Sequence, residues 1–249
     1  MRKQGRIRMT LAAVALLGVT TSAMAADTMV MDSLSVKAGK TKVKPITYEE
    51  FATLRAKLGA CIVQRNRSKV KAYLQHSDSV TIDYKSLGTD ETKFMFYFDI
   101  SGCSDYNVPQ LTQPVFVAKG GLRNLLLESA YLDAVKSAPQ PAVDDKGEPT
   151  AGVTRNFPTT TDALPSVKMF AALADCTAAK NPAAADAVVR SRAGLSDEKD
   201  AAVALAPTIG SCMPAGQNIS LTQASIRTLA AEGLWGRYAA GPPAQASAK

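Results

Sequence analysis

The sequence predicts an all-α protein made of two tandem small helical units, each of three to four short helices closed by one internal disulfide. Three observations predict this class. Each half of the chain contains two cysteines, each contains apolar residues at helical spacing, and each ends with the same short motif. The motif, R-x-L-x-x-E-x-x-[YW], occurs at 123–131 and again at 227–235. Self-similarity of this kind indicates a duplicated structural unit.

Residues 1–25 are expected to form a secretory signal peptide. Four basic side chains precede a short apolar stretch, and Ala23-Met24-Ala25 matches a cleavage site. The stretch is too short to span a bilayer, so no transmembrane segment is expected in the mature chain. The expected location is periplasmic or secreted. Removal of this segment would lower the net charge from +7 to +3, because it holds four basic and no acidic residues. Such a weak positive balance does not indicate a nucleic-acid partner.

Composition divides the chain into segments. They are the signal peptide (1–25), an irregular lead-in (26–46), helical repeat unit 1 (47–135), a proline-rich linker (136–165), helical repeat unit 2 (166–238) and a tail (239–249). Prolines and a D-D-K-G turn sequence are typical of a linker. The tail consists mainly of Ala, Gly, Pro and Ser, a composition typical of disorder.

The four cysteines predict disulfides, because exported chains usually oxidise an even set. The duplication favours Cys61–Cys103 and Cys176–Cys212, since each unit would then close on itself. Each bond would stabilise its unit by roughly 4 kcal/mol through the lost entropy of the unfolded chain. Pairing across the units stays open as an alternative. No metal site is expected, because there is no C-x-x-C and His76 is the only histidine.

Local patterns predict the helices in order. The first helix of each unit follows from apolar residues at helical spacing that end on a cysteine: Leu54, Leu58 and Cys61, then Met169, Leu173 and Cys176. Asn66 and Asn181 are predicted N-caps of a second helix, with Pro182 at its first position. In the second unit, a third helix is predicted from Ser196 to about Gly210, and a fourth from about 222 to 238.

The first unit departs from this pattern between 76 and 98. Val80, Ile82 and Tyr84 alternate as in a strand, and residues 93–98 are rich in aromatic side chains, which favour strands. A β-hairpin insertion therefore stays open. Helix is favoured for 90–100, because the corresponding residues 201–209 are alanine-rich and related units should share elements.

The repeated motif predicts a terminal helix in each unit. Its candidate interaction residues are Arg123, Glu128, Tyr131, Arg227, Glu232 and Trp235. The leucines form an apolar stripe on the opposite side, and the small residue at 129 or 233 would allow another helix to approach closely. The aromatic residues are expected to pack under a neighbouring helix or across the interface between units, with Arg and Glu as caps or surface pairs. A ligand-contact patch is the alternative.

No catalytic constellation is predicted, because the lone His76 has no supporting motif, and neither H-E-x-x-H nor a P-loop is present. No cofactor is expected. The favoured function is a non-enzymatic binding or scaffolding protein of the cell envelope, whose partner is an unknown envelope protein or a small ligand. Two alternatives stay open. One is a carboxylate-dependent cell-wall hydrolase. The other is a carrier of a small apolar ligand, with Tyr131, Trp235 and residues 94–98 lining its cavity.

The chain resembles a group of exported proteins of sphingomonad-type alphaproteobacteria. The resemblance rests on the cysteine-bearing helix, the I-x-x-C turn at 100–103 and 209–212, and the terminal motif. It covers both units but not the linker or the tail. It implies export and a helical fold, and it implies no activity, no cofactor and no catalytic residues.

Overall fold

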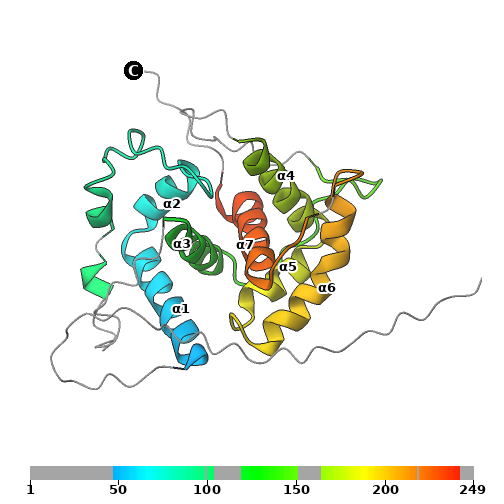
Figure 1. Ribbon diagram of the computed structural model, residues 1–249, viewed down its shortest axis with the longest axis horizontal. Coiled ribbons are helices and arrows are strands. Elements are labelled where there is room, and N and C mark those ends of the chain that lie inside the picture. Colours follow the sequence, from blue (N-terminus) through cyan, green and yellow to red (C-terminus); the bar gives the residue numbers. More distant parts are fainter. Residues whose placement is uncertain (1–46, 99, 104–118, 151–163, 218, 242–249) are drawn as a thin grey trace, which may run out of the picture. The chain divides into compact units, whose positions relative to one another are not determined.

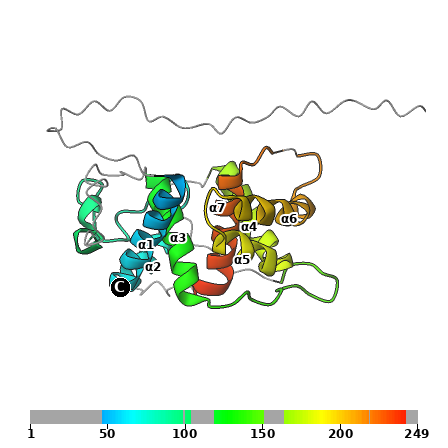
Figure 2. The same ribbon diagram turned by 90° about the horizontal axis from the view of Figure 1, so that it is seen from below.

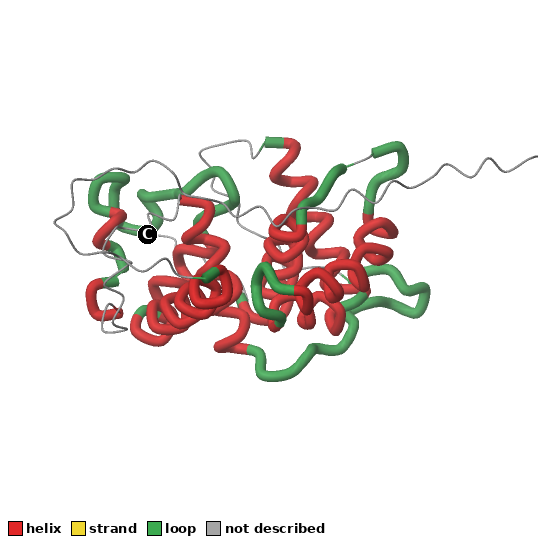
Figure 3. Tube along the Cα trace, turned by 60° about the horizontal axis from the view of Figure 1, so that its bottom comes forward, coloured by secondary structure: helices red, strands yellow, loops and turns green. Residues whose placement is uncertain are grey.

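The computed structural model describes residues 47–98, 100–103, 119–150, 164–217 and 219–241. All regular secondary structure in these ranges is helical (Figure 3). The α-helices are α1 (Tyr48–Arg65), α2 (Arg67–Gln75), α3 (Lys119–Ala134), α4 (Pro165–Lys180), α5 (Pro182–Arg190), α6 (Ser196–Cys212) and α7 (Gln223–Leu234). The expected signal peptide, the lead-in and residues 242–249 of the tail lie outside the described residues. No helix in the described ranges has both the length and the apolar character that crossing a membrane requires.

Both disulfides form within a unit, as the sequence predicts. Cys61 of α1 bonds to Cys103 in the short 3-10 turn Ser101–Cys103 (η2), across a sequence separation of 42. Cys176 of α4 bonds to Cys212, the last residue of α6, across a separation of 36. Each bond therefore ties the first helix of a unit to a residue that lies between the second helix and the terminal helix of that unit. Two formed disulfides are compatible with an oxidising compartment.

Local capping interactions explain where the helices begin. α1 starts with a capping box, in which Thr47 and Glu50 each accept a hydrogen bond from the other's backbone N–H. Asn181 caps α5 as predicted, because its side chain accepts from Ala184 N at 3.1 Å. Asn66 stands at the equivalent position before α2, but its side chain donates to the carbonyl of Ile62 instead. The predicted position of Asn66 before the second helix is thus confirmed, whereas the prediction that its side chain caps this helix is wrong.

The two units share one hydrophobic core through their terminal helices. α3 packs against α1 and α2, α7 packs against α4 and α5, and α3 and α7 pack against each other. Figures 1 and 2 show α3 and α7 between the remaining helices of the two units. Leucines of both terminal helices, including Leu126 and Leu229, are fully buried in this core. Burial of each such side chain contributes about 1.5–3 kcal/mol, so neither terminal helix is independent of the other unit.

Small residues allow the first and last helices of each unit to cross closely. A Cβ atom on Gly233 of α7 would stand 2.0 Å from the carbonyl oxygen of Ala174 in α4. At the corresponding crossing, a Cβ atom on Gly59 of α1 would stand 2.1 Å from Ser129 Oγ of α3. Close helix approach at 129 and 233 is therefore confirmed.

The segment between α2 and η2 is neither the helix favoured for 90–100 nor a β-hairpin. It contains one isolated bridge, Ser77–Ile82, and one 3-10 turn, Phe94–Phe96 (η1). Three aspartates begin successive turns by accepting hydrogen bonds from backbone N–H groups two or three residues later: Asp78, Asp83 and Asp90. Such bonds stabilise turns, and only turns and one short 3-10 turn follow them in residues 83–98. Both expectations for this segment are therefore wrong.

Four of the five aromatic residues of this segment lie in the core or pack against it. The rings of Phe94 and Phe98 lie 5.3 and 5.5 Å from the ring of Tyr73 on α2, and all three side chains are buried. Phe96 is 85% exposed. The aromatic composition that suggested a strand therefore reflects burial of side chains from irregular backbone.

Candidate functional site

The motif residues of the two terminal helices pair reciprocally. Both guanidinium Nη atoms of Arg123 on α3 donate to the carboxylate of Glu232 on α7, one of them at 3.0 Å. Arg227 Nε on α7 donates to Glu128 Oε2 on α3 at 3.0 Å. The arginine of each helix thus meets the glutamate of the other, which is the contact pattern of an isologous interface. The two helices therefore run in opposite directions where they cross.

These four residues are buried, with 3–8% of their surface exposed. The expectation that the arginines and glutamates form surface pairs is wrong. Arginine and glutamate five residues apart do not face each other along one helix. In the structure each finds its partner on the other terminal helix.

Arg227 also caps the second helix of unit 2, which was one of the two roles expected for these arginines. Arg227 donates to the carbonyls of Val188 and Val189 at 2.8 Å, which places its positive charge at the C-terminus of α5. Arg123 Nε donates to Ser77 Oγ at 3.1 Å, just after α2. Burial lowers the pKa of the Arg123 guanidinium, but the Glu232 carboxylate outweighs this, and the pKa lies above its ordinary value.

The two motif aromatics are buried as expected. Tyr131 is fully buried, and its hydroxyl donates to Asp186 Oδ1 of α5 at 2.7 Å, so this side chain packs across the interface between units. Asp186 is also bound by Arg190 Nε. Trp235, at the start of the π-helical turn Trp235–Ala239 (η3), is 5% exposed and belongs to the shared core.

Because of Tyr131, the folded protein is expected to lose stability at alkaline pH. Burial first, and then the hydrogen bond to Asp186, raise the pKa of Tyr131 above its ordinary value of 10. A raised pKa in the folded state adds stability that is complete below the unfolded pKa of about 10 and is lost as pH rises toward the folded pKa. We expect the free energy of unfolding to fall between pH 10 and 11, by up to about 1.4 kcal/mol for each such tyrosine. Tyr131→Phe should reduce this slope in urea unfolding.

Tyr73 supplies an internal reference for this measurement, because burial raises its pKa to about 12. The variant should therefore keep part of the alkaline slope. Equal slopes for the variant and the unaltered protein would contradict the prediction.

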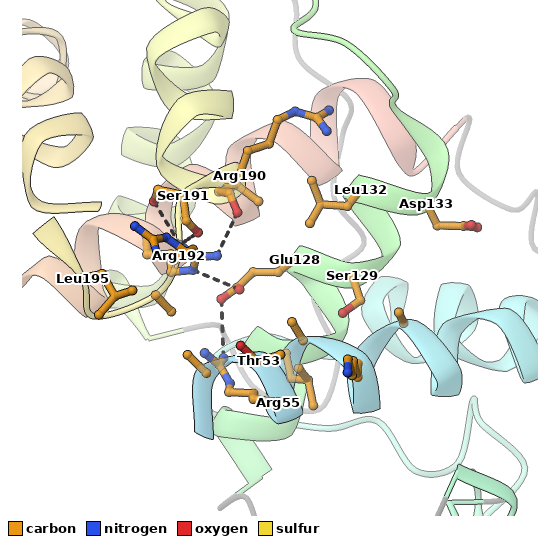
Figure 4. Close-up of a pocket in the computed structure, with 18 of the residues that line it drawn as sticks. Thr53, Arg55, Glu128, Ser129, Leu132, Asp133, Arg190, Ser191, Arg192 and Leu195 are labelled. Atoms are coloured by element: carbon orange, nitrogen blue, oxygen red, sulfur yellow. Dashed lines mark hydrogen bonds and ion pairs between the residues drawn. The ribbon is translucent and has the colours of Figure 1, made fainter. Parts of the chain in front are cut away.

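A groove of about 470 Å³ lies between α1, α3 and the residues that join α5 to α6. We call it the basic groove, because six basic and three acidic side chains line it. They are Arg55, Lys57, Lys136, Arg190, Arg192 and Arg227, with Glu49, Glu128 and Asp133. Figure 4 shows Glu128 extending from α3 between Arg55 of α1 and the Ser191–Arg192 loop. Two of the predicted interaction residues, Glu128 and Arg227, thus line the groove.

One face of α1 forms a low wall of the basic groove. Its residues there are mainly small and share helical spacing: Ala52, Thr53, Ala56 and Ala60. Thr53, Ala56 and Ala60 are exposed. The short side chains leave space in front of α3, and the charged groups stand around that space.

The acidic residues of the groove are already paired with arginines. Glu128 binds Arg227, Glu49 binds Arg192 at 3.0 Å, and Asp133 binds Arg67 at 3.1 Å. Lys57 and Lys136 are exposed, and neither forms an ion pair within the described part of the chain. The groove therefore has positive charge that its own carboxylates do not neutralise.

Sequence reasoning missed most of this groove. Arg123, Glu232, Tyr131 and Trp235 lie in the interface or core and do not line it. Arg55, Arg190 and Arg192 do line it, but they come from two helices and a loop far apart in the sequence. The closely spaced Arg190 and Arg192 after a predicted helix were the available signal.

Searches of protein-family models, curated proteins and solved structures find no match to this chain. Fold and site together define an all-α protein of two disulfide-closed helical units, joined by reciprocal buried ion pairs and bearing a basic groove.

Proposed function

We propose that this protein is an exported, non-enzymatic binding protein of the cell envelope, and that its basic groove binds an anionic ligand. Two exposed lysines of its lining, Lys57 and Lys136, form no ion pair within the described residues and carry the proposal. Carboxylate or phosphate groups form short, charge-assisted hydrogen bonds with arginine and lysine. A cleft lined by one sign of charge also raises the local concentration of the opposite ion.

The signal-like residues 1–25 and the two disulfides support export. Disulfides persist in the periplasm and outside the cell, whereas the cytosol keeps thiols reduced. The periplasm is therefore the compartment that we propose for this protein.

The state of the groove carboxylates favours binding over hydrolysis. Carboxylate-dependent hydrolysis of a glycosidic bond needs one carboxylic acid that donates a proton and a second carboxylate that attacks or activates water. Glu49, Glu128 and Asp133 each already hold an arginine. The residues proposed for an apolar ligand do not line the groove: Tyr131 and Trp235 are buried, and none of residues 94–98 lies in its lining. Neither alternative function gains support from this geometry.

Calorimetric titration with citrate tests the proposed anion site. We expect citrate to bind the unaltered protein and to bind Lys57→Gln/Lys136→Gln at least tenfold more weakly. These lysines make no ion pair in the described residues, so their loss should leave folding unchanged. The control, Lys168→Gln/Lys199→Gln, removes the same charge from exposed positions outside the groove. Absent binding, or an equal loss in the control, would refute the proposal.

A further inference from the structure

The basic groove has a counterpart surface in the second unit. Aligning Cys61 with Cys176 makes α1 equivalent to α4, and aligning Glu128 with Glu232 makes α3 equivalent to α7. The faces of α1 and α3 that line the groove therefore correspond to faces of α4 and α7. The segment that occupies the surface of α4 and α7 therefore indicates what kind of ligand the basic groove can bind.

Part of the linker, residues 140–150, is seated on that counterpart surface. Ala142 N donates to the carbonyl of Ala179, near the end of α4, at 3.0 Å. Arg237 Nη2, just beyond α7, donates to the carbonyl of Thr150 at 3.2 Å. The contacts are made largely to the peptide backbone, so this surface holds a non-helical chain segment.

Charge also contributes to this intramolecular contact. Glu148 of the linker lies 3.5 Å from Lys180 at the end of α4. The seated segment turns back on itself at residues 144–147, and its two arms are joined by an antiparallel bridge between Val143 and Pro149. A non-helical, turned segment with a carboxylate therefore occupies basic and polar donors of the second unit.

Burial differs between the two surfaces at equivalent positions. Ala171 and Ala179 of α4 are 8% and 0% exposed. Their equivalents on α1, Ala56 and Gln64, are exposed and line the basic groove. A helix face that is covered in the second unit is open in the first.

We propose that the basic groove binds an extended acidic peptide segment of a partner protein. This inference rests on the proposed function and names its ligand. The groove offers Lys57 and Lys136 as donors that no carboxylate of the described residues holds, and a lysine also holds the linker carboxylate in the second unit. The positive charge of these two lysines selects carboxylate side chains.

The length of the groove also suits a peptide. Its lining residues on α1 run from Glu49 to Gln64, a span of roughly 22 Å at the rise of an α-helix. An extended chain covers this span with about seven residues. A compact anion would contact only a part of the same face.

Fluorescence anisotropy with a defined peptide tests the inference. The probe is a fluorescein-labelled octapeptide of alternating Glu and Thr, and its matched control is the octapeptide of alternating Gln and Thr. We expect the acidic peptide to bind at least tenfold more tightly than the neutral one and at least tenfold more tightly than citrate. Lys57→Gln/Lys136→Gln should weaken its binding at least tenfold, whereas Lys168→Gln/Lys199→Gln should leave it unchanged.

The outcomes separate this inference from the proposed function. Citrate binding that depends on Lys57 and Lys136, without tighter peptide binding, would leave an anion site and overturn the peptide ligand. Binding of neither probe would overturn both. Equal weakening by both double variants would indicate non-specific attraction and also overturn the inference.

Hydrogen exchange locates the bound peptide. We expect the acidic octapeptide to slow amide exchange in residues 52–64 of α1 and in the α5–α6 loop. Protection confined to α4 and to residues 140–150 would show that the peptide displaces the linker instead, and this result would overturn the assignment to the basic groove.

Discussion

Replacing Glu232 with Gln is expected to lower the free energy of unfolding by about 3–5 kcal/mol, because it leaves the Arg123 guanidinium charged and buried without its carboxylate. Arg123 is only 3% exposed, so water cannot replace the lost partner. Urea unfolding at neutral pH measures the change. Glu49→Gln is the control, since it breaks the Glu49–Arg192 pair, whose side chains are 60% and 63% exposed. That change should cost less than about 1 kcal/mol.

A double-mutant cycle tests whether Arg123 and Glu232 act as a pair. Arg123→Met/Glu232→Gln should cost less than the sum of the two single changes, because the double variant leaves no buried charge unpaired. Additive costs, or a loss below about 1 kcal/mol for Glu232→Gln, would show that the pair contributes nothing specific.

The Arg227–Glu128 pair should lose less stability when its carboxylate is removed. Glu128→Gln also removes a buried carboxylate, but Arg227 keeps hydrogen bonds to the carbonyls of Val188 and Val189 and has Glu198 within 3.4 Å. We therefore expect Glu128→Gln to cost less than Glu232→Gln. The difference would come from surroundings that the two motifs do not share.

Gly233→Ala is expected to destabilise the protein by about 1–3 kcal/mol or more through overpacking. The added Cβ would stand 2.0 Å from the carbonyl oxygen and 2.7 Å from the carbonyl carbon of Ala174, so α4 and α7 would have to separate. Backbone atoms cannot rotate away as side chains do. Thermal and urea unfolding measure the loss, and the two methods should agree in sign.

Two further glycines serve as matched controls. Gly210 lies inside α6 with no atom within 4 Å of its would-be Cβ, so Gly210→Ala should be neutral or stabilise by up to about 1 kcal/mol. Gly59→Ala should cost less than Gly233→Ala, because the atoms it meets belong to the side chains of Ser129 and Leu125. A harmless Gly233→Ala would refute the close crossing of α4 and α7.

Local patterns were sufficient to predict most helices. Apolar spacing around Cys61 and Cys176 predicted α1 and α4, and the Asn181-Pro182 pair predicted the start of α5. These signals act within one or two helical turns, and so tertiary contacts do not alter them. The disulfides followed from the equal distribution of cysteines between the two units.

The segment 76–98 shows where local reasoning fails. Aromatic composition and alternation favoured a strand, and analogy to the second unit favoured a helix. Side-chain hydrogen bonds from Asp78, Asp83 and Asp90 compete with both by binding the backbone in turns. The aspartates themselves were the available signal, because aspartate favours turns, but the aromatic pattern suggested a strand more strongly.

The sequence by itself predicted the helical class and the small residues at the helix crossings, and it favoured the two within-unit disulfides over pairing across the units. These features depend on spacing along the chain, and spacing is visible without coordinates. Tertiary structure alone decided that the motif arginines and glutamates pair between α3 and α7, and that Arg55 and Arg192 meet at one groove. Such contacts join residues far apart in sequence, and local periodicity does not contain their orientation. The repeated motif therefore identifies a buried interface between the two units, and the basic groove lies where that interface reaches the surface.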